Sequence, residues 1–116
     1  MVAVAPLIMG LPGPTLDKQT VALIEKIRPV GFILFGRNCE SKEQVQALCA
    51  GLRDLSPLDP PLIFIDQEGG RVMRIKWGEY TPPPARDIGK IYAADKHRGI
   101  ELARLNAYVI ASELNE

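Results

Sequence analysis

Two uninterrupted apolar runs of strand length constrain this chain more than any other feature. They occupy residues 31–35 and 62–65, and neither alternates polar with apolar residues as a half-exposed strand does. Each is predicted to be a strand buried on both faces, which is typical of a parallel sheet flanked by helices. A third run, residues 7–9, leads into the glycine- and proline-rich stretch 10–14, which indicates a strand followed by a loop.

Helical periodicity fills the segments between these strands and after the last one. Apolar residues recur at helical spacing before position 28, where Thr15 or Asp17 can cap the first turn. Ser41 and Gln44 occupy the positions of a capping box at the start of a second helix. A further helix is predicted from about Asp95 to Leu114.

The predicted order is strand, helix, strand, helix, strand, helix, which indicates parallel strands joined by crossover helices. A long irregular stretch, with a short helical turn near residues 88–91, precedes the last helix. Two architectures satisfy this order: an open doubly wound sheet and part of a (β/α)8 barrel. Because such a barrel needs about 250 residues, this chain of 116 residues would supply three of the eight units, as one domain.

Composition excludes several classes of partner. Fourteen basic residues balance fourteen acidic ones, which gives no reason to expect nucleic acid or an anionic membrane as a partner. Cys39 and Cys49 match no common zinc or redox spacing, and we expect no metal and no cofactor. No apolar run approaches the roughly 18 residues of a membrane span, and no basic residue precedes Lys18 as in a signal peptide. The sequence therefore predicts a cytoplasmic protein.

Charged residues gather where the third predicted strand ends. Ligands of parallel α/β folds bind beyond the carboxyl ends of the strands, where a partly desolvated Asp66 can accept strong hydrogen bonds from sugar hydroxyls. Gly69 and Gly70 allow a sharp turn, and Arg71 and Arg74 can bind a hydroxyl, a carbonyl or a carboxylate. From residue types alone, an alternative is equally open: Asp66 caps a turn and the arginines pair with surface carboxylates.

Two segments resemble signatures of glycoside hydrolase family 3. They are residues 31–38 (GFILFGRN) and 65–74 (IDQEGGRVMR), and seven consecutive residues of the second, 66–72, agree with the family pattern. Residues 13–16 and 104–114 fit as well, so the resemblance spans nearly the whole chain. It is nearest to the bacterial β-N-acetylhexosaminidases of peptidoglycan recycling.

The resemblance implies that residues 1–116 are the N-terminal part of a longer family 3 barrel, comprising its first three strand–helix units. It implies a retaining hydrolase that releases terminal β-linked N-acetylglucosamine from peptidoglycan fragments through a glycosyl-enzyme intermediate. The histidine acid/base motif and the aspartate nucleophile motif of this branch are absent from the chain. We therefore expect no catalytic residue here and no turnover by the chain alone. The expected partners are a small carbohydrate, such as an N-acetylglucosaminyl muropeptide, and the missing C-terminal part of the barrel.

Two site residues are implied by the resemblance. Asp66 and Arg74 match the family residues that hold the sugar at the nonreducing end. The remaining matching positions are read as motif support: Arg37, Asn38, Glu68, Gly69, Gly70 and Arg71.

Other interpretations compete with this one. His97, the single histidine, lies outside the family motif and is predicted to be a solvent-facing helix residue. Asp66 and Glu68 are too close in sequence to bracket a sugar as acid and nucleophile. Trp77 could stack on a sugar or cover the loop. A noncatalytic sugar- or protein-binding module that keeps the Asp66–Arg74 pocket is the main alternative function, and an open-sheet ligand-binding domain is a third.

Overall fold

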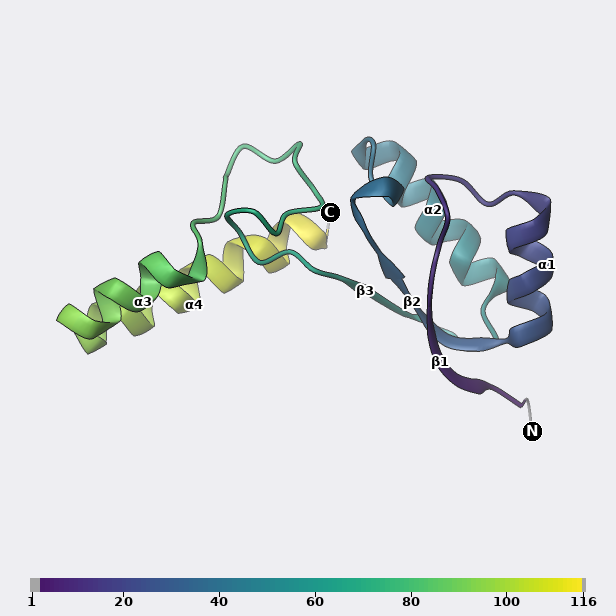
Figure 1. Cartoon of the computed structure of the whole chain (residues 1–116), viewed down its shortest axis with the longest axis horizontal. Helices are drawn as coiled ribbons and strands as arrows, with labels where there is room; N and C mark the ends of the chain where they lie inside the picture. The colour runs from purple at the N-terminus through teal and green to yellow at the C-terminus, as the bar shows by residue number, and fades with distance from the viewer. Residues whose placement is uncertain (1–2, 116) are drawn as a thin grey trace. The chain divides into compact units, whose positions relative to one another are not determined.

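The computed structural model describes residues 3–115, which form two compact units that meet in the sequence between Asp66 and Gln67 (Figure 1). The first unit contains three strands and three helical segments: β1 (Ala5–Gly10), α1 (Lys18–Ile27), β2 (Pro29–Leu34), the 3-10 turn η1 (Gly36–Asn38), α2 (Lys42–Leu55) and β3 (Leu62–Ile65). The second contains a long loop and two helices, α3 (Ala85–Ala94) and α4 (Lys96–Leu114).

The three strands form one parallel sheet in the order β1-β2-β3. Gly10 of β1 pairs with Ile33 of β2, and Ile33 pairs with Phe64 of β3. The carboxyl ends of all three strands therefore lie along one edge of the sheet. The predicted parallel α/β order, with its three strands, is confirmed.

Helix α1 begins and ends where the sequence indicates. The Asp17 side chain accepts a hydrogen bond from the Thr20 backbone N–H at 2.7 Å, so Asp17 rather than Thr15 is the cap. Arg28 follows the helix in the left-handed conformation, with φ of 55°, and β2 starts directly afterwards at Pro29.

The start of α2 departs in part from the predicted capping box. The Ser41 hydroxyl accepts from the Gln44 N–H at 3.2 Å, as expected. The Gln44 amide, however, accepts from the Glu40 N–H at 2.8 Å and donates to the Pro14 carbonyl at 2.7 Å. An amide can accept and donate at once, so Gln44 also ties the loop after β1 to this helix.

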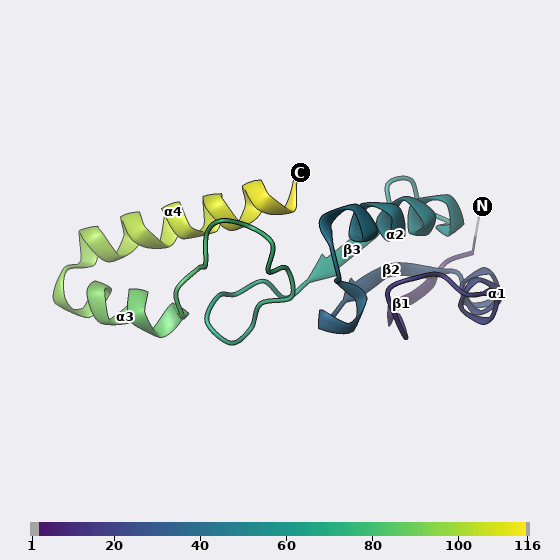
Figure 2. The same ribbon diagram turned by 90° about the horizontal axis from the view of Figure 1, so that it is seen from above.

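One face of the sheet is buried and carries the core. Helices α1 and α2 lie on this face (Figures 1 and 2). The buried cluster beneath them consists of Leu11, Ile24, Phe32, Leu34, Leu48 and Leu52.

The opposite face corrects the expectation that both faces of the strands are buried. It is apolar, but no element of residues 3–66 covers it. Leu62 and Phe64 of β3 are 47% and 42% exposed, and Ile8 of β1 is 46% exposed. The uninterrupted apolar pattern thus predicts correctly that both faces of the sheet are apolar. Within this unit, however, helices cover only one of them.

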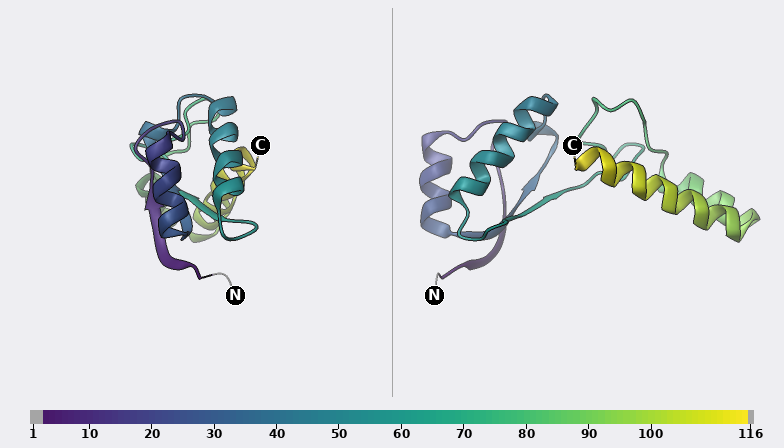
Figure 3. Two further views of the ribbon diagram at one scale, coloured as in Figure 1. Left: turned by 90° about the vertical axis from the view of Figure 1, so that its right-hand side faces the viewer. Right: turned by 180° about the vertical axis from the view of Figure 1, so that it is seen from behind.

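The second unit is dominated by a helical hairpin. Helices α3 and α4 run side by side in opposite directions (Figure 2; Figure 3 gives two further views). Helix α3 is a full helix of ten residues instead of the short predicted turn. Asp95 caps α4 by accepting from the Arg98 N–H at 3.1 Å. Among residues 3–115, no helix is long and apolar enough to cross a membrane.

Candidate functional site

Asn38 joins the loops that follow the first two strands. Its side chain is fully buried. It accepts from the Phe35 N–H at 2.8 Å and donates to the carbonyls of Leu11 and Gly13 at 3.1 and 2.8 Å. The Oδ1 atom and both N–H groups of the amide are thus hydrogen-bonded to the backbone. This residue organises the rim of the sheet and is not available to a ligand.

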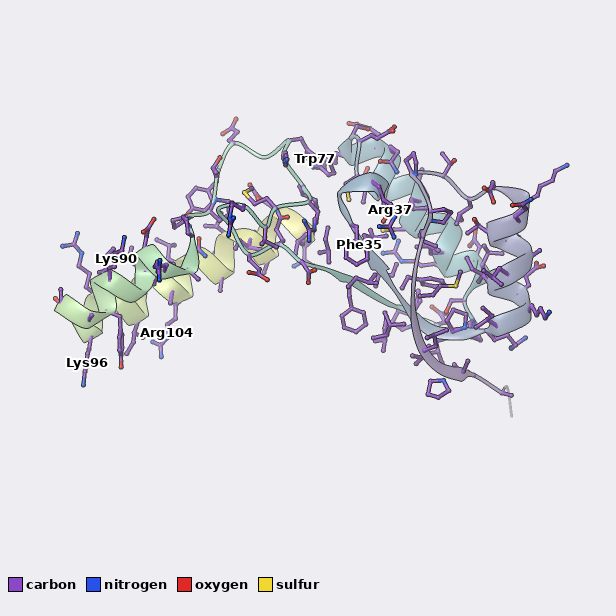
Figure 4. All side chains as sticks on the ribbon, in the orientation of Figure 1. Phe35, Arg37, Trp77, Lys90, Lys96 and Arg104 are labelled. Atoms are coloured by element: carbon purple, nitrogen blue, oxygen red, sulfur yellow. The ribbon has the colours of Figure 1, made fainter. Side chains whose placement is uncertain are left out.

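Arg37 lies beside Asn38 and serves the same rim. Its Nε donates to the Leu11 carbonyl at 2.7 Å, and its guanidinium lies over the Phe35 ring at 4.9 Å from the centroid (Figure 4). This geometry combines a charge-assisted hydrogen bond with a cation–π contact. Arg37 and Asn38 therefore both support the rim of the sheet.

Asp66 follows the last residue of β3 directly and is half-buried. Because Leu34 pairs with Ile65, Asp66 lies at the carboxyl end of the sheet, level with Phe35, where the turn to Asn38 begins. A carboxylate at this edge has the position that ligand-binding groups occupy in parallel α/β folds.

Gln67 fixes the start of the loop in the second unit. Its side chain is nearly buried, at 9% exposure. Its Oε1 accepts from the backbone N–H groups of Arg74 and Ile75 at 2.8 and 3.1 Å, and its Nε2 donates to the Ile75 carbonyl at 2.9 Å. These three bonds close the loop so that the backbone of Arg74 has a fixed position.

Sequence reasoning gave Gln67 no role. Successive side chains of an extended backbone point to opposite sides, so the sequence does predict that Gln67 faces away from the side of Asp66. Its partners, however, lie seven and eight residues away, and no spacing rule predicts them.

Gly69 and Gly70 form the turn inside this loop, both with positive φ, at 98° and 57°. A Cβ at Gly69 would overlap the Pro83 carbonyl oxygen, and the Gly70 N–H donates to the Pro82 carbonyl at 3.0 Å. The two glycines thus allow the turn to pack against the proline-rich stretch. Glu68 is exposed and its backbone N–H pairs with the Val72 carbonyl at 2.9 Å, which agrees with a role in loop geometry.

The two arginines of the motif differ in environment. Arg74 is half-buried, whereas Arg71 is exposed. His97 has a side chain that is 85% exposed, with Nδ1 at 3.6 Å from the Glu101 carboxylate, in agreement with the predicted solvent-facing position. Among residues 3–115, no three His, Cys, Asp or Glu side chains come together as a metal site would require.

The cysteines carry no redox signature. Cys39 and Cys49 are both half-buried. Burial raises the pKa of the Cys49 thiol, which disfavours the reactive thiolate.

The chain is similar to curated proteins and to solved structures of one kind. No family model matches the chain. Curated proteins called beta-hexosaminidase, from Xylella fastidiosa (strain 9a5c) and Stenotrophomonas maltophilia (strain K279a), are each 40% identical over 108 residues, which is 93% of this chain and 32% of theirs. The chain thus spans about a third of the length of the curated relatives it matches.

Solved structures show the same likeness. NagZ from Neisseria gonorrhoeae in complex with N-trifluoroacetyl-D-glucosamine matches with a TM-score of 0.87 and 27% identity, over 97% of this chain and 33% of that one. A glycoside hydrolase family 3 beta-N-acetylglucosaminidase from Paenibacillus sp. str. FPU-7 matches with a TM-score of 0.75 and 32% identity, over 93% and 20% of the two chains. The predicted fold class, strand–helix units that form part of a (β/α)8 barrel, is confirmed.

Proposed function

We propose, on the premise that this chain belongs to glycoside hydrolase family 3 as a segment of a β-hexosaminidase, that the protein carrying it hydrolyses O-glycosyl bonds and releases terminal β-linked N-acetylglucosamine. The observation that carries the proposal is the 40% identity to β-hexosaminidases along 93% of the chain. The ligand in the similar Neisseria structure, N-trifluoroacetyl-D-glucosamine, supports the choice of an amino sugar.

The contribution of this chain is sugar binding. We assign the nonreducing-end sugar to Asp66 and Arg74, which flank the glycine turn of the loop after β3. An ionised carboxylate accepts hydrogen bonds from hydroxyls, and a guanidinium donates to ring substituents, so the two groups bind a hexosamine by complementary means. Arg37, Asn38, Glu68, Gly69, Gly70 and Arg71 hold the rim and the loop in place.

The chemical step belongs to residues outside this chain. Retaining hydrolysis uses a nucleophile and an acid/base group close together across the sugar, and neither family motif occurs among the 116 residues. We propose that residues 1–116 are one part of a longer barrel that supplies both. We also propose that its substrates are peptidoglycan fragments and that it acts in the cytoplasm.

The test removes the Asp66 carboxylate from the protein that carries this chain. Asp66→Ala should lower kcat/KM for 4-nitrophenyl N-acetyl-β-D-glucosaminide by about 100-fold or more, because truncating one side of a desolvated charged contact costs about 2–5 kcal/mol. Asp54→Ala is the matched control, since Asp54 is an exposed carboxylate near the end of α2. It should leave the kinetics unchanged.

Two results would refute the assignment. Near-normal kinetics in Asp66→Ala would refute the sugar contact. Binding of N-acetylglucosamine without hydrolysis of any glucosaminide would favour the noncatalytic binding module instead.

A further inference from the structure

The loop that follows β3 is closed at two levels. At its tip, the Glu68 backbone N–H donates to the Val72 carbonyl at 2.9 Å. At its base, the Gln67 side chain binds the backbone of Arg74 and Ile75 through three hydrogen bonds of 2.8, 3.1 and 2.9 Å. Backbone pairing therefore holds the tip of the loop, whereas one amide side chain holds its base.

A glutamine amide has the atoms that this base requires. Its Oε1 accepts from the N–H groups of two adjacent residues, and its Nε2 donates to the carbonyl of the second. An ionised glutamate could accept but not donate, and an asparagine is one methylene shorter. Gln67 and Ile75 are only 9% and 7% exposed, so removing the amide leaves backbone groups without their partner in a largely buried place.

Arg74 is the residue whose position follows from this closure. Its backbone N–H donates to Gln67 Oε1 at 2.8 Å, and its side chain is half-buried. A guanidinium sits at the end of a long side chain with several rotatable bonds, so its placement depends on a backbone that is already fixed. Misplacing a binding group by about 1 Å can cost about 100-fold in rate, so the bond between Arg74 and Gln67 bears on the binding of a ligand by Arg74.

We propose that Gln67 is a positioning residue for the sugar: by fixing the backbone of Arg74, it holds the guanidinium where the nonreducing-end sugar requires it. The inference rests on the proposed function and adds a residue that acts without touching the sugar. Asp66 directly precedes Gln67 in the chain. Two consecutive residues thus serve the same sugar, one by direct contact and the other through Arg74.

The test is a double-mutant cycle in the protein that carries this chain, with kcat/KM for 4-nitrophenyl N-acetyl-β-D-glucosaminide as the measured quantity. Gln67→Met keeps the length of the side chain and removes its polar atoms. It should lower kcat/KM by about 10- to 100-fold in the unmodified protein. In the Arg74→Met background it should lower kcat/KM by less than about 2-fold, because two residues that act through one contact are not additive. A role in stability alone would give the same factor in both backgrounds.

The matched control is Gln19→Met, because Gln19 is an exposed glutamine on α1. It should leave kcat/KM unchanged. Gln67→Asn, which keeps an amide on a shorter side chain, enters the same cycle if Gln67→Met does not fold, and the same non-additivity is expected.

A second measurement needs no variant. The amide protons of Arg74 and Ile75 should exchange with solvent about 100-fold more slowly than in an unstructured peptide before any sugar is added. Unprotected amides, or losses that are additive in the cycle, overturn the inference and leave the proposed function standing. Normal kinetics in Arg74→Met would overturn the proposed sugar contact and the inference together.

Discussion

At the residue scale, a single buried amide connects the ends of two strands. The Asn38 amide forms hydrogen bonds with the Phe35 N–H and with the carbonyls of Leu11 and Gly13. Asn38→Ala would remove the partner of the Phe35 N–H and of the Gly13 carbonyl, whereas the Leu11 carbonyl would keep its bond from Arg37. Since an unsatisfied buried group costs about 1–3 kcal/mol, and neighbouring losses are not additive, we expect the free energy of unfolding to fall by about 2–4 kcal/mol. Urea titration followed by circular dichroism measures this loss.

The control for this substitution is Asn115→Ala. Asn115 is exposed and follows α4, so its truncation should change the free energy of unfolding by no more than about 0.5 kcal/mol. Equal losses in the two variants would contradict the role given to Asn38.

At the element scale, α1 depends on the carboxylate at its start. The hydrogen bond from the Thr20 backbone N–H lowers the pKa of Asp17 below its ordinary value. A lowered pKa in the folded state means that the ionised form stabilises the fold above the unfolded pKa of about 3.9. This contribution is lost as the pH falls through the lowered folded pKa.

Asp17→Ala should therefore be less stable than the unmodified protein at pH 7, and the difference should shrink below about pH 4. Urea titrations at pH 7, 5 and 3 measure it. Asp17→Ser keeps an oxygen that caps without charge, so its stability relative to Asp17→Ala should not change over this range. A difference between the unmodified protein and Asp17→Ala that does not vary with pH would argue against the charged cap.

The helical hairpin offers two glycines with opposite expectations. A Cβ at Gly99 would overlap the backbone of Tyr92, where α3 and α4 approach each other, whereas Gly89 has nothing within 4 Å of its Cβ position. Gly99→Ala should destabilise the protein by about 1–3 kcal/mol through overpacking. Gly89→Ala should stabilise it by about 0.5–1 kcal/mol, because alanine has the higher helix propensity.

Thermal unfolding of both variants gives the comparison directly. If Gly99→Ala unfolds at the same temperature as the unmodified protein or above it, the close packing of α3 on α4 is wrong.

The same elements show how far sequence reasoning extends. Apolar runs and caps predict β2, β3, α1 and α4 because their signals lie within a few residues. Helix α3 is underestimated, since it follows three prolines and its apolar residues Ile88 and Ile91 are few.

The candidate site divides in the same way. Asp66 and the glycine turn are local features that a motif contains. The bonds of Gln67, and those of Asn38 to Leu11 and Gly13, join residues 7 to 27 positions apart. Such contacts follow from the fold and not from spacing.

At the scale of the whole molecule, one sheet face determines how residues 1–116 behave when produced alone. Two rows of side chains cross this face: Ile8, Gly31 and Leu62 in one, and Gly10, Ile33 and Phe64 in the other. In the first row a glycine separates two large side chains, and Leu62 fills the space beside Gly31. A face of this kind fits the interior of a barrel, whose packed layers consist of branched apolar side chains.

We therefore expect the isolated 116-residue polypeptide to associate and to release no 4-nitrophenol from 4-nitrophenyl N-acetyl-β-D-glucosaminide. The exposed apolar face and the unpaired edges of β1 and β3 favour pairing with other copies, and the chain lacks the catalytic motifs. Phe64→Lys should shift sedimentation toward the monomer, because it places a charge on that face. Leu23→Lys, on α1 at 44% exposure, should not. A monomeric unmodified polypeptide would contradict the role given to the exposed face. Measurable turnover by it would contradict the assignment of the chemical step to residues outside these 116.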